Sequence, residues 1–173
     1  LILIRLLKSG KIFIWAICNN LILQTFLEYY FYLFVMKIMH VITRSDLGGA
    51  QSVLINIVNS LCRENEVIVI AGEGDGKMWE LLDKRIRRIN VPALKRNISI
   101  INDIKVLFSF LSIYRRYEPD VIHLHSSKVG LLGRLAFPKG KVIYTVHGFD
   151  SIRLAYRPFL FLERMLQYRC KAI

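Results

Sequence analysis

Short apolar segments alternate with helix-like segments from Met36 to the end of the chain, and this alternation constrains the fold more than any other feature. The apolar segments are nearly continuous runs, which is typical of strands covered on both faces. We expect strands at residues 37–43, 66–71, 85–91, 121–125 and 142–147, and helices at 49–63, 78–84, 98–117, 129–137 and 158–170. Five such repeats predict an α/β fold, a doubly wound, Rossmann-like parallel sheet with strand order 3-2-1-4-5. Residues 171–173 look like the beginning of a sixth strand.

Two of the expected helices carry apolar residues at the spacing of one helix face. In the helix at 49–63 these residues are Ala50, Val53, Leu54, Ile57, Val58 and Leu61. In the helix at 98–117 they are Ile101, Ile104, Leu107, Phe108, Leu111 and Tyr114. We expect both stripes to face the core.

The first 35 residues differ in composition from the rest and are expected to form a separate hydrophobic leader before a single domain at 36–173. They contain an uncharged run at residues 12–27, which is shorter than the roughly 20 apolar residues of a spanning helix. Three interpretations remain open: a membrane anchor, an interfacial segment, or translated upstream sequence with the true start at Met36. We favour the last, because Met-Lys-Ile leads directly into the first strand.

The chain of 173 residues has a formal net charge of +12, and nearly all of that charge follows Met36. A basic surface of this kind favours a phosphate ligand, an anionic membrane surface or nucleic acid. No nucleic-acid-binding motif is present, so we do not expect a nucleic-acid partner. The three cysteines are scattered and form no CxxC pair, which indicates a reducing compartment rather than a disulfide framework.

A glycine pair, Gly48 and Gly49, lies where the first strand turns into the first helix. Glycines there let the backbone approach a ligand closely, and the helix start offers free N–H groups to an anion. Gln51 could add a side-chain amide; the alternative is a simple tight turn. The glycine-rich segment at 72–77 matches neither a P-loop nor GxGxxG, and we interpret it as a solvated turn.

His123 and His125 are two residues apart on an expected strand and should project from the same face. A metal site would need a third ligand, and we predict none. Hydrogen bonding is the favoured role, with His125 nearer the ligand crevice and His123 buried below it. Ser126, Ser127 and Lys128 follow on a turn, where Lys128 could bind a phosphate or carboxylate or could simply be solvated.

His147 and Gly148 end the fifth strand, and Asp150 lies close by in sequence. A neutral histidine there could contact a sugar hydroxyl or carry a proton, although a lone histidine is more often structural. Strands 1, 4 and 5 are neighbours in the predicted order. Their polar ends are therefore expected to converge on one crevice.

Three segments together resemble the N-terminal domain of bacterial glycosyltransferases of family 4, which have the GT-B architecture. They are KIMHVITRSDLGGAQ at 37–51, DVIHLHSSKVGLLGR at 120–134 and YTVHGFD at 144–150. The likeness is strongest to enzymes of capsular, exopolysaccharide and lipopolysaccharide assembly. It implies two Rossmann-like halves around a cleft, an acceptor side and a nucleotide-sugar side, and transfer with retention and without a metal or other cofactor.

Residue roles also follow from this resemblance. Gly48 and Gly49, with Gln51 beside them, would lie against the donor's diphosphate, and His147 would act beside the transferred sugar. The cleft would be lined by His125, Ser126, Ser127, Lys128, Gly148 and Asp150.

The implied function is transfer of a sugar from a nucleotide-sugar donor to a lipid-linked saccharide acceptor. The expected location is the cytoplasmic face of the plasma membrane, with the chain either peripheral or anchored by residues 1–35. The 173 residues lack the family's second, donor-binding half, so we expect the chain alone to be inactive. One alternative is a non-catalytic acceptor-binding subunit of a split transferase. A GT-B sugar-nucleotide epimerase is less favoured, because the SSKVGLLGR stretch looks more like the transferases.

Overall fold

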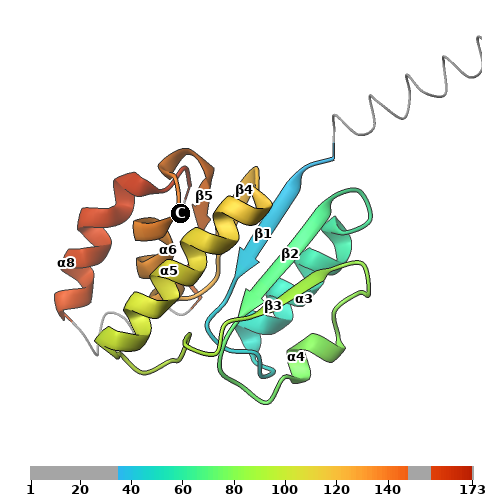
Figure 1. Ribbon diagram of the computed structural model, residues 1–173, viewed down its shortest axis with the longest axis horizontal. Coiled ribbons are helices and arrows are strands. Elements are labelled where there is room, and N and C mark those ends of the chain that lie inside the picture. Colours follow the sequence, from blue (N-terminus) through green and yellow to red (C-terminus); the bar gives the residue numbers. More distant parts are fainter. Residues whose placement is uncertain (1–34, 148–156, 173) are drawn as a thin grey trace, which may run out of the picture. The chain divides into compact units, whose positions relative to one another are not determined.

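The computed structural model describes residues 35–147 and 157–172 of the chain, all but the first of them within the compact unit Met36–Ile173. Their centre is a five-stranded sheet in the order β3-β2-β1-β4-β5, in which every pair of neighbours is parallel (Figure 1). The strands are β1 (Lys37–Val41), β2 (Glu66–Ala71), β3 (Arg87–Asn90), β4 (Val121–Leu124) and β5 (Val142–Tyr144). The predicted fold class and strand order are therefore confirmed.

Helices cover both faces of this sheet. They are α3 (Gly49–Leu61), α4 (Lys77–Glu80), α5 (Ile100–Tyr117), α6 (Ser127–Ala136) and α8 (Arg157–Leu166), with short 3-10 turns at Lys139–Lys141 and Gln167–Arg169. One core contains side chains of α5 and α6, and the other contains side chains of α3 and α4. Figure 1 shows α5 in front of the sheet and α3 behind it. We call these two sides the α5 face and the α3 face.

Side chains of the central strands alternate between the two faces, as the pleat of a strand requires. Met39 and Val41 of β1 belong to the core of the α5 face, while Ile42 belongs to that of the α3 face. In β4, Ile122 and Leu124 lie on the α5 face. Residues 40, 123 and 125 are therefore directed to the α3 face, and all three are histidines.

A sixth strand begins where the sequence predicted it. Ala172 forms a parallel bridge with Ile143 of β5. The backbone N–H of Lys171 donates to the Val142 carbonyl at 2.7 Å, and that of Tyr144 donates to the Ala172 carbonyl at 3.1 Å. The segment after α8 thus extends the sheet beyond β5 with the expected direction.

The expected burial of α5 is wrong in part. Val106 and Phe110 are its buried residues, whereas Ile101 and Phe108 are each 69% exposed and Ile104 is 48% exposed. The helix carries apolar residues around most of its circumference, so its sequence offers two stripes at helical spacing. Packing against the sheet buries one of them and leaves the other in solvent.

The apolar stripe predicted for α3 agrees better with the observed burial than the one predicted for α5. Leu54 and Val58 are fully buried, as predicted, and Ile55 joins them. Val53 is 45% exposed, although it was placed on the core-facing side.

Within the described residues, every helix falls short of the length or apolar character that crossing a bilayer requires. The uncharged run at 12–27 lies outside the described residues.

Candidate functional site at the carboxyl edge of the sheet

The ends of β1, β4 and β5 lie next to one another, as the strand order requires. Beyond the end of β4, the backbone N–H of His125 donates to the Val41 carbonyl at 2.9 Å. The hydroxyls of Thr43 and Ser126 share a hydrogen bond of 2.5 Å, which joins the segments that follow β1 and β4. After β5, the backbone N–H of Thr145 donates to the Leu124 carbonyl at 2.9 Å, so the segments that follow the three strands form one continuous edge.

All four histidines of the chain gather at this edge. His40 and His123 are directly paired in the register of β1 and β4. The ring centroids of His123 and His125 are 3.9 Å apart, and those of His40 and His125 are 5.2 Å apart. The His147 ring stacks on His125 at 5.5 Å. The predicted projection of His123 and His125 from one face is confirmed, and His40 and His147 share that face.

Hydrogen bonds connect three of these rings in a row. His40 Nδ1 and His125 Nε2 are 2.9 Å apart, and His125 Nδ1 and His147 Nε2 are 3.2 Å apart. His123 lies beside this row and is bonded instead through Nε2 to the Thr145 hydroxyl at 2.8 Å. We call His40, His125 and His147 the histidine row.

Burial keeps the inner rings neutral. His40 is 1% exposed and His125 is 0% exposed. Desolvation, with a smaller contribution from His123, lowers the pKa of His40 to about 3. Desolvation and the neighbouring imidazoles lower the pKa of His125 to about 2, and desolvation with His147 lowers that of His123 to about 4. Burial also lowers the pKa of His147. Each inner ring therefore has one N–H and one bare nitrogen at neutral pH.

The predicted order of burial along β4 is reversed. His125 is fully buried, and His123 is only partly buried. The sequence analysis placed His125 at the tip of the expected strand, nearer the crevice, and His123 buried below it. His40 of β1 and His147, which follows β5, both bond to His125 and shield its ring from solvent.

His40 also supplies the third nitrogen that a metal site at His123 and His125 would need. One ring nitrogen from each of these three residues lies within 4.8 Å of the others. In this structure, however, His40 Nδ1 and His125 Nε2 are bonded to each other at 2.9 Å, and His123 Nε2 is bonded to the Thr145 hydroxyl. We therefore interpret the group as a hydrogen-bonded cluster.

The glycine turn lies at the same edge, after β1. Gly48 precedes α3 with an extended backbone, and no side chain caps the helix start. A Cβ placed on Gly49 would meet nothing within 4 Å, so space is open in front of the first turn. Gln51 donates from Nε2 to the Arg44 carbonyl at 3.3 Å and lies over Gly48. Exposed N–H groups and the positive end of a 13-residue helix suit an anion.

The second predicted phosphate-binding group is already paired. Lys128 Nζ lies 2.6 Å from Asp103 Oδ1 and donates to the Asn97 carbonyl at 2.5 Å. Its side chain is 13% exposed. The ammonium of Lys128 therefore ties α6 to the start of α5. Ser126 and Ser127 stand at the start of α6, whereas Gly148 and Asp150 lie outside the described residues.

Sequence reasoning missed His40, Thr43 and Thr145. A usable signal was present, because His40 sits on β1 at a position that the predicted order pairs with β4. All four histidines fall on three predicted neighbouring strands. Combining that order with side-chain alternation would have placed His40 beside His123.

Comparison with known proteins assigns the chain to a family. The sequence model of Glycosyltransferase Family 4 matches residues 47–173. Over 132 residues the chain is 36% identical to the UDP-Gal:alpha-D-GlcNAc-diphosphoundecaprenol alpha-1,3-galactosyltransferase of Escherichia coli, a match that covers 70% of this chain and 34% of the relative. It is 30% identical over 144 residues to an uncharacterized 41.2 kDa protein in the cps region of Klebsiella pneumoniae, covering 76% of this chain and 37% of that protein.

A solved structure shares the fold. Anabaena HepE, crystallised with UDP and glucose, superposes with a TM-score of 0.55 at 18% identity, over 76% of this chain and 35% of that one. The chain thus spans about a third of the length of the proteins it matches. With a family match over most of its length and a shared fold, the chain belongs to Glycosyltransferase Family 4.

Proposed function

We propose that this chain is the acceptor-side part of a glycosyltransferase that moves a sugar from a nucleotide donor to a lipid-linked saccharide in cell-surface polysaccharide synthesis. Family membership and 36% identity to a galactosyltransferase support this proposal. That relative's name specifies a UDP-sugar donor and an acceptor on diphosphoundecaprenol. Both substrates contain a diphosphate, which agrees with the basic character of this chain.

The observation that carries the proposal is the pairing of an open, uncapped glycine turn with a histidine at one sheet edge. The open turn at Gly48 and Gly49 follows β1, and His147 follows β5 with β4 between them. In the proposed arrangement the donor's diphosphate lies against the glycine turn and the transferred sugar lies beside His147. The remaining charge on the departing diphosphate would be stabilised by groups outside these 173 residues.

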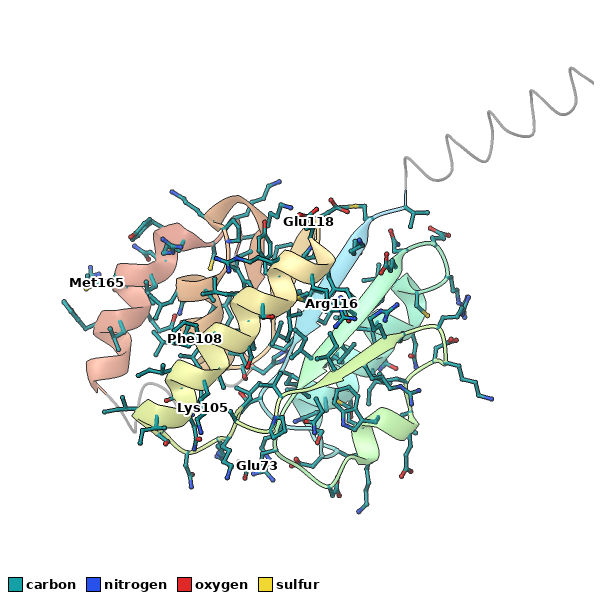
Figure 2. All side chains as sticks on the ribbon, in the orientation of Figure 1. Glu73, Lys105, Phe108, Arg116, Glu118 and Met165 are labelled. Carbon is teal, nitrogen blue, oxygen red and sulfur yellow. The ribbon has the colours of Figure 1, made fainter. Side chains whose placement is uncertain are left out.

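The exposed side of α5 suits the lipid that holds such an acceptor. Ile101, Ile104 and Phe108 are exposed at helical spacing on α5, and the exposed Lys105 and Arg115 belong to the same helix. Figure 2 shows Phe108 and Lys105 on α5. Apolar side chains bordered by cations are the composition of a surface that rests on an anionic bilayer. We assign this α5 surface to contact with the anionic leaflet, which would bring the sheet edge to the lipid-linked substrate.

A ligand titration tests the site. UDP added to the 15N-labelled 173-residue chain is expected to shift the amide signals of Gly49 and its neighbours and the ring signals of His147. Gly49→Val fills the open space and should weaken UDP binding at least tenfold. Gly140→Val is the matched control, because a Cβ on Gly140 also meets nothing within 4 Å and Gly140 lies away from the site. Equal affinities of the two variants would refute the diphosphate position.

A turnover assay tests the assignment of the chain to one side of the enzyme. The chain alone is expected to transfer no sugar from a panel of nucleotide sugars to a GlcNAc-diphospholipid acceptor. Addition of a donor-binding domain from a family relative should restore transfer. Brisk turnover by the chain alone would contradict the proposal.

A further inference from the structure

The histidine row links a nearly inaccessible ring to one that is partly exposed. His40 is 1% exposed, His125 is 0% exposed and His147 is only partly buried. Each bond in the row joins Nδ1 of one ring to Nε2 of the next. A neutral imidazole has one N–H and one acceptor nitrogen, so a ring that accepts at Nε2 must carry its proton on Nδ1. The proton position in one ring therefore dictates the position in the next.

Only two proton arrangements satisfy both bonds, and they run in opposite directions. In the outward arrangement, His40 donates from Nδ1 to His125, and His125 donates from Nδ1 to His147. In the inward arrangement, His147 donates from Nε2, His125 donates from Nε2, and His40 carries its proton on Nε2. These assignments follow from the hydrogen-bond network.

The inner end of the row distinguishes the two arrangements. Within the described part of the chain, His40 Nε2 is buried and has no hydrogen-bond partner. The inward arrangement would bury an N–H donor there without an acceptor, which native structures almost never contain. The outward arrangement leaves only a bare nitrogen, and buried acceptors without a partner are tolerated more often. The geometry therefore favours the outward arrangement.

We propose that His40 and His125 are positioning residues that hold His147 as the Nδ1–H tautomer, so that its free ring nitrogen is a hydrogen-bond donor. The ligand group it fits is an oxygen acceptor, a sugar hydroxyl or a phosphate oxygen. The identity of that ligand rests on the proposed function, whereas the tautomer rests on the row alone.

The Nδ1–H tautomer decides between the two roles that the sequence left open for His147, contact with a sugar hydroxyl and transfer of a proton. With Nε2 occupied by the His125 N–H and Nδ1 protonated, the ring has no bare nitrogen available to take a proton from a substrate. His147 therefore stabilises charge on a substrate oxygen by donating a hydrogen bond, and it does not act as a general base. The lowered pKa values of His40 and His125 agree with this assignment, because they keep both inner rings neutral.

Nitrogen NMR of the 173-residue chain, labelled with 15N only in histidine, measures the tautomer directly at neutral pH. We expect the Nδ1–H form at His40, His125 and His147. A free histidine side chain in water carries its proton mainly on Nε2, so the expected result at His147 differs from the default. Observation of His147 in the Nε2–H form would overturn the proposal.

Variants of the inner ring test the direction of the effect. His40→Leu removes the donor to His125 and should let His147 relax toward the Nε2–H form. His40→Asn keeps an N–H near the position of Nδ1 and should restore the Nδ1–H form. His123→Leu is the control, because His123 bonds to Thr145 and stands outside the row. Equal tautomer shifts in His40→Leu and His123→Leu would contradict the role of His40.

The tautomer readout needs no turnover. A chain that keeps the Nδ1–H form at His147 but transfers no sugar when the donor-binding domain is added would refute the proposed function and leave the positioning role intact. A chain that transfers sugar with that domain while His147 is in the Nε2–H form would refute the positioning role and leave the proposed function intact.

Discussion

The two faces of the sheet bury polar groups in different ways. On the α5 face, the side chain of Arg134 of α6 is 0% exposed, and Glu163 of α8 pairs with its guanidinium at 2.5 Å. The same guanidinium lies over the Tyr144 ring at 4.8 Å and donates to the Gly130 carbonyl. On the α3 face, the buried polar groups are neutral imidazoles bonded to one another. The ion pair of Arg134 and Glu163 joins α6 to α8 on the α5 face. The neutral, hydrogen-bonded imidazoles of the α3 face can instead form hydrogen bonds with a ligand.

The largest expected difference between the two faces is their response to acid, which should weaken the α3 face through its buried histidines. The folded pKa values of His40 and His125, about 3 and about 2, lie below the ordinary 6.5, so the unfolded chain binds these protons more readily. Their stabilising contribution is complete above pH 6.5 and is lost as the pH falls toward the folded values. Two such groups remove on the order of 4 kcal/mol between pH 6.5 and 5. Urea unfolding measured across this range tests the loss.

The control for acid sensitivity is the double variant His40→Leu/His125→Leu, in which only His123 and His147 of the cluster can still titrate. Its free energy of unfolding should change much less between pH 6.5 and 5. An identical pH dependence in the parent chain and the double variant would show that the histidine row does not govern acid stability.

Removing the partner of Arg134 should have the next largest effect. Glu163→Ala leaves a fully buried guanidinium without its carboxylate, and about 3 kcal/mol of unfolding free energy should be lost. Glu64→Ala is the matched control, because Glu64 is exposed and forms no ion pair among the described residues. Urea denaturation at pH 7 compares them, and equal midpoints would mean that the ion pair contributes nothing.

Adding a methyl group should destabilise the chain at Gly130 but not at Gly49. A Cβ on Gly130 would lie 2.5 Å from the Tyr144 ring, whereas one on Gly49 would meet open space. Overpacking against the buried tyrosine should cost Gly130→Ala about 2 kcal/mol. Gly49→Ala should leave the free energy of unfolding nearly unchanged. Thermal unfolding of both variants is the measurement. A larger loss of unfolding free energy for Gly49→Ala than for Gly130→Ala would contradict the predicted difference between the two glycines.

The smallest expected effect concerns the exposed side of α5. Lys105→Gln should weaken binding to vesicles rich in anionic lipid by roughly fivefold, since a cation near such a surface contributes about 1 kcal/mol. Lys84→Gln is the control, because Lys84 is exposed and precedes β3, outside α5. Vesicle sedimentation with anionic and neutral lipid measures the difference. Equal losses in the two variants would argue against this surface.

Local patterns in the sequence were sufficient for the architecture. Apolar periodicity predicted the five strands, their parallel order and the beginning of the sixth. Strand ends were predicted one to three residues too long at β4 and β5, because the first turn-forming residues in the sequence, Ser126 and Gly148, come only after the ladder has ended. The resemblance to family 4 rested on three short motifs and is confirmed by the family match.

The sequence alone determined which residues share a face, because side-chain alternation and helical period are properties of the local backbone. It therefore brought the glycine turn, His125 and His147 to one edge. Only the tertiary structure decided burial and pairing, which depend on neighbours distant in the chain. Asp103 neutralises Lys128 from α5, residues after β5 cover His125, and packing on the sheet left Phe108 in solvent. The donor direction of the histidine row likewise depends on His40, which is 85 residues from its partner.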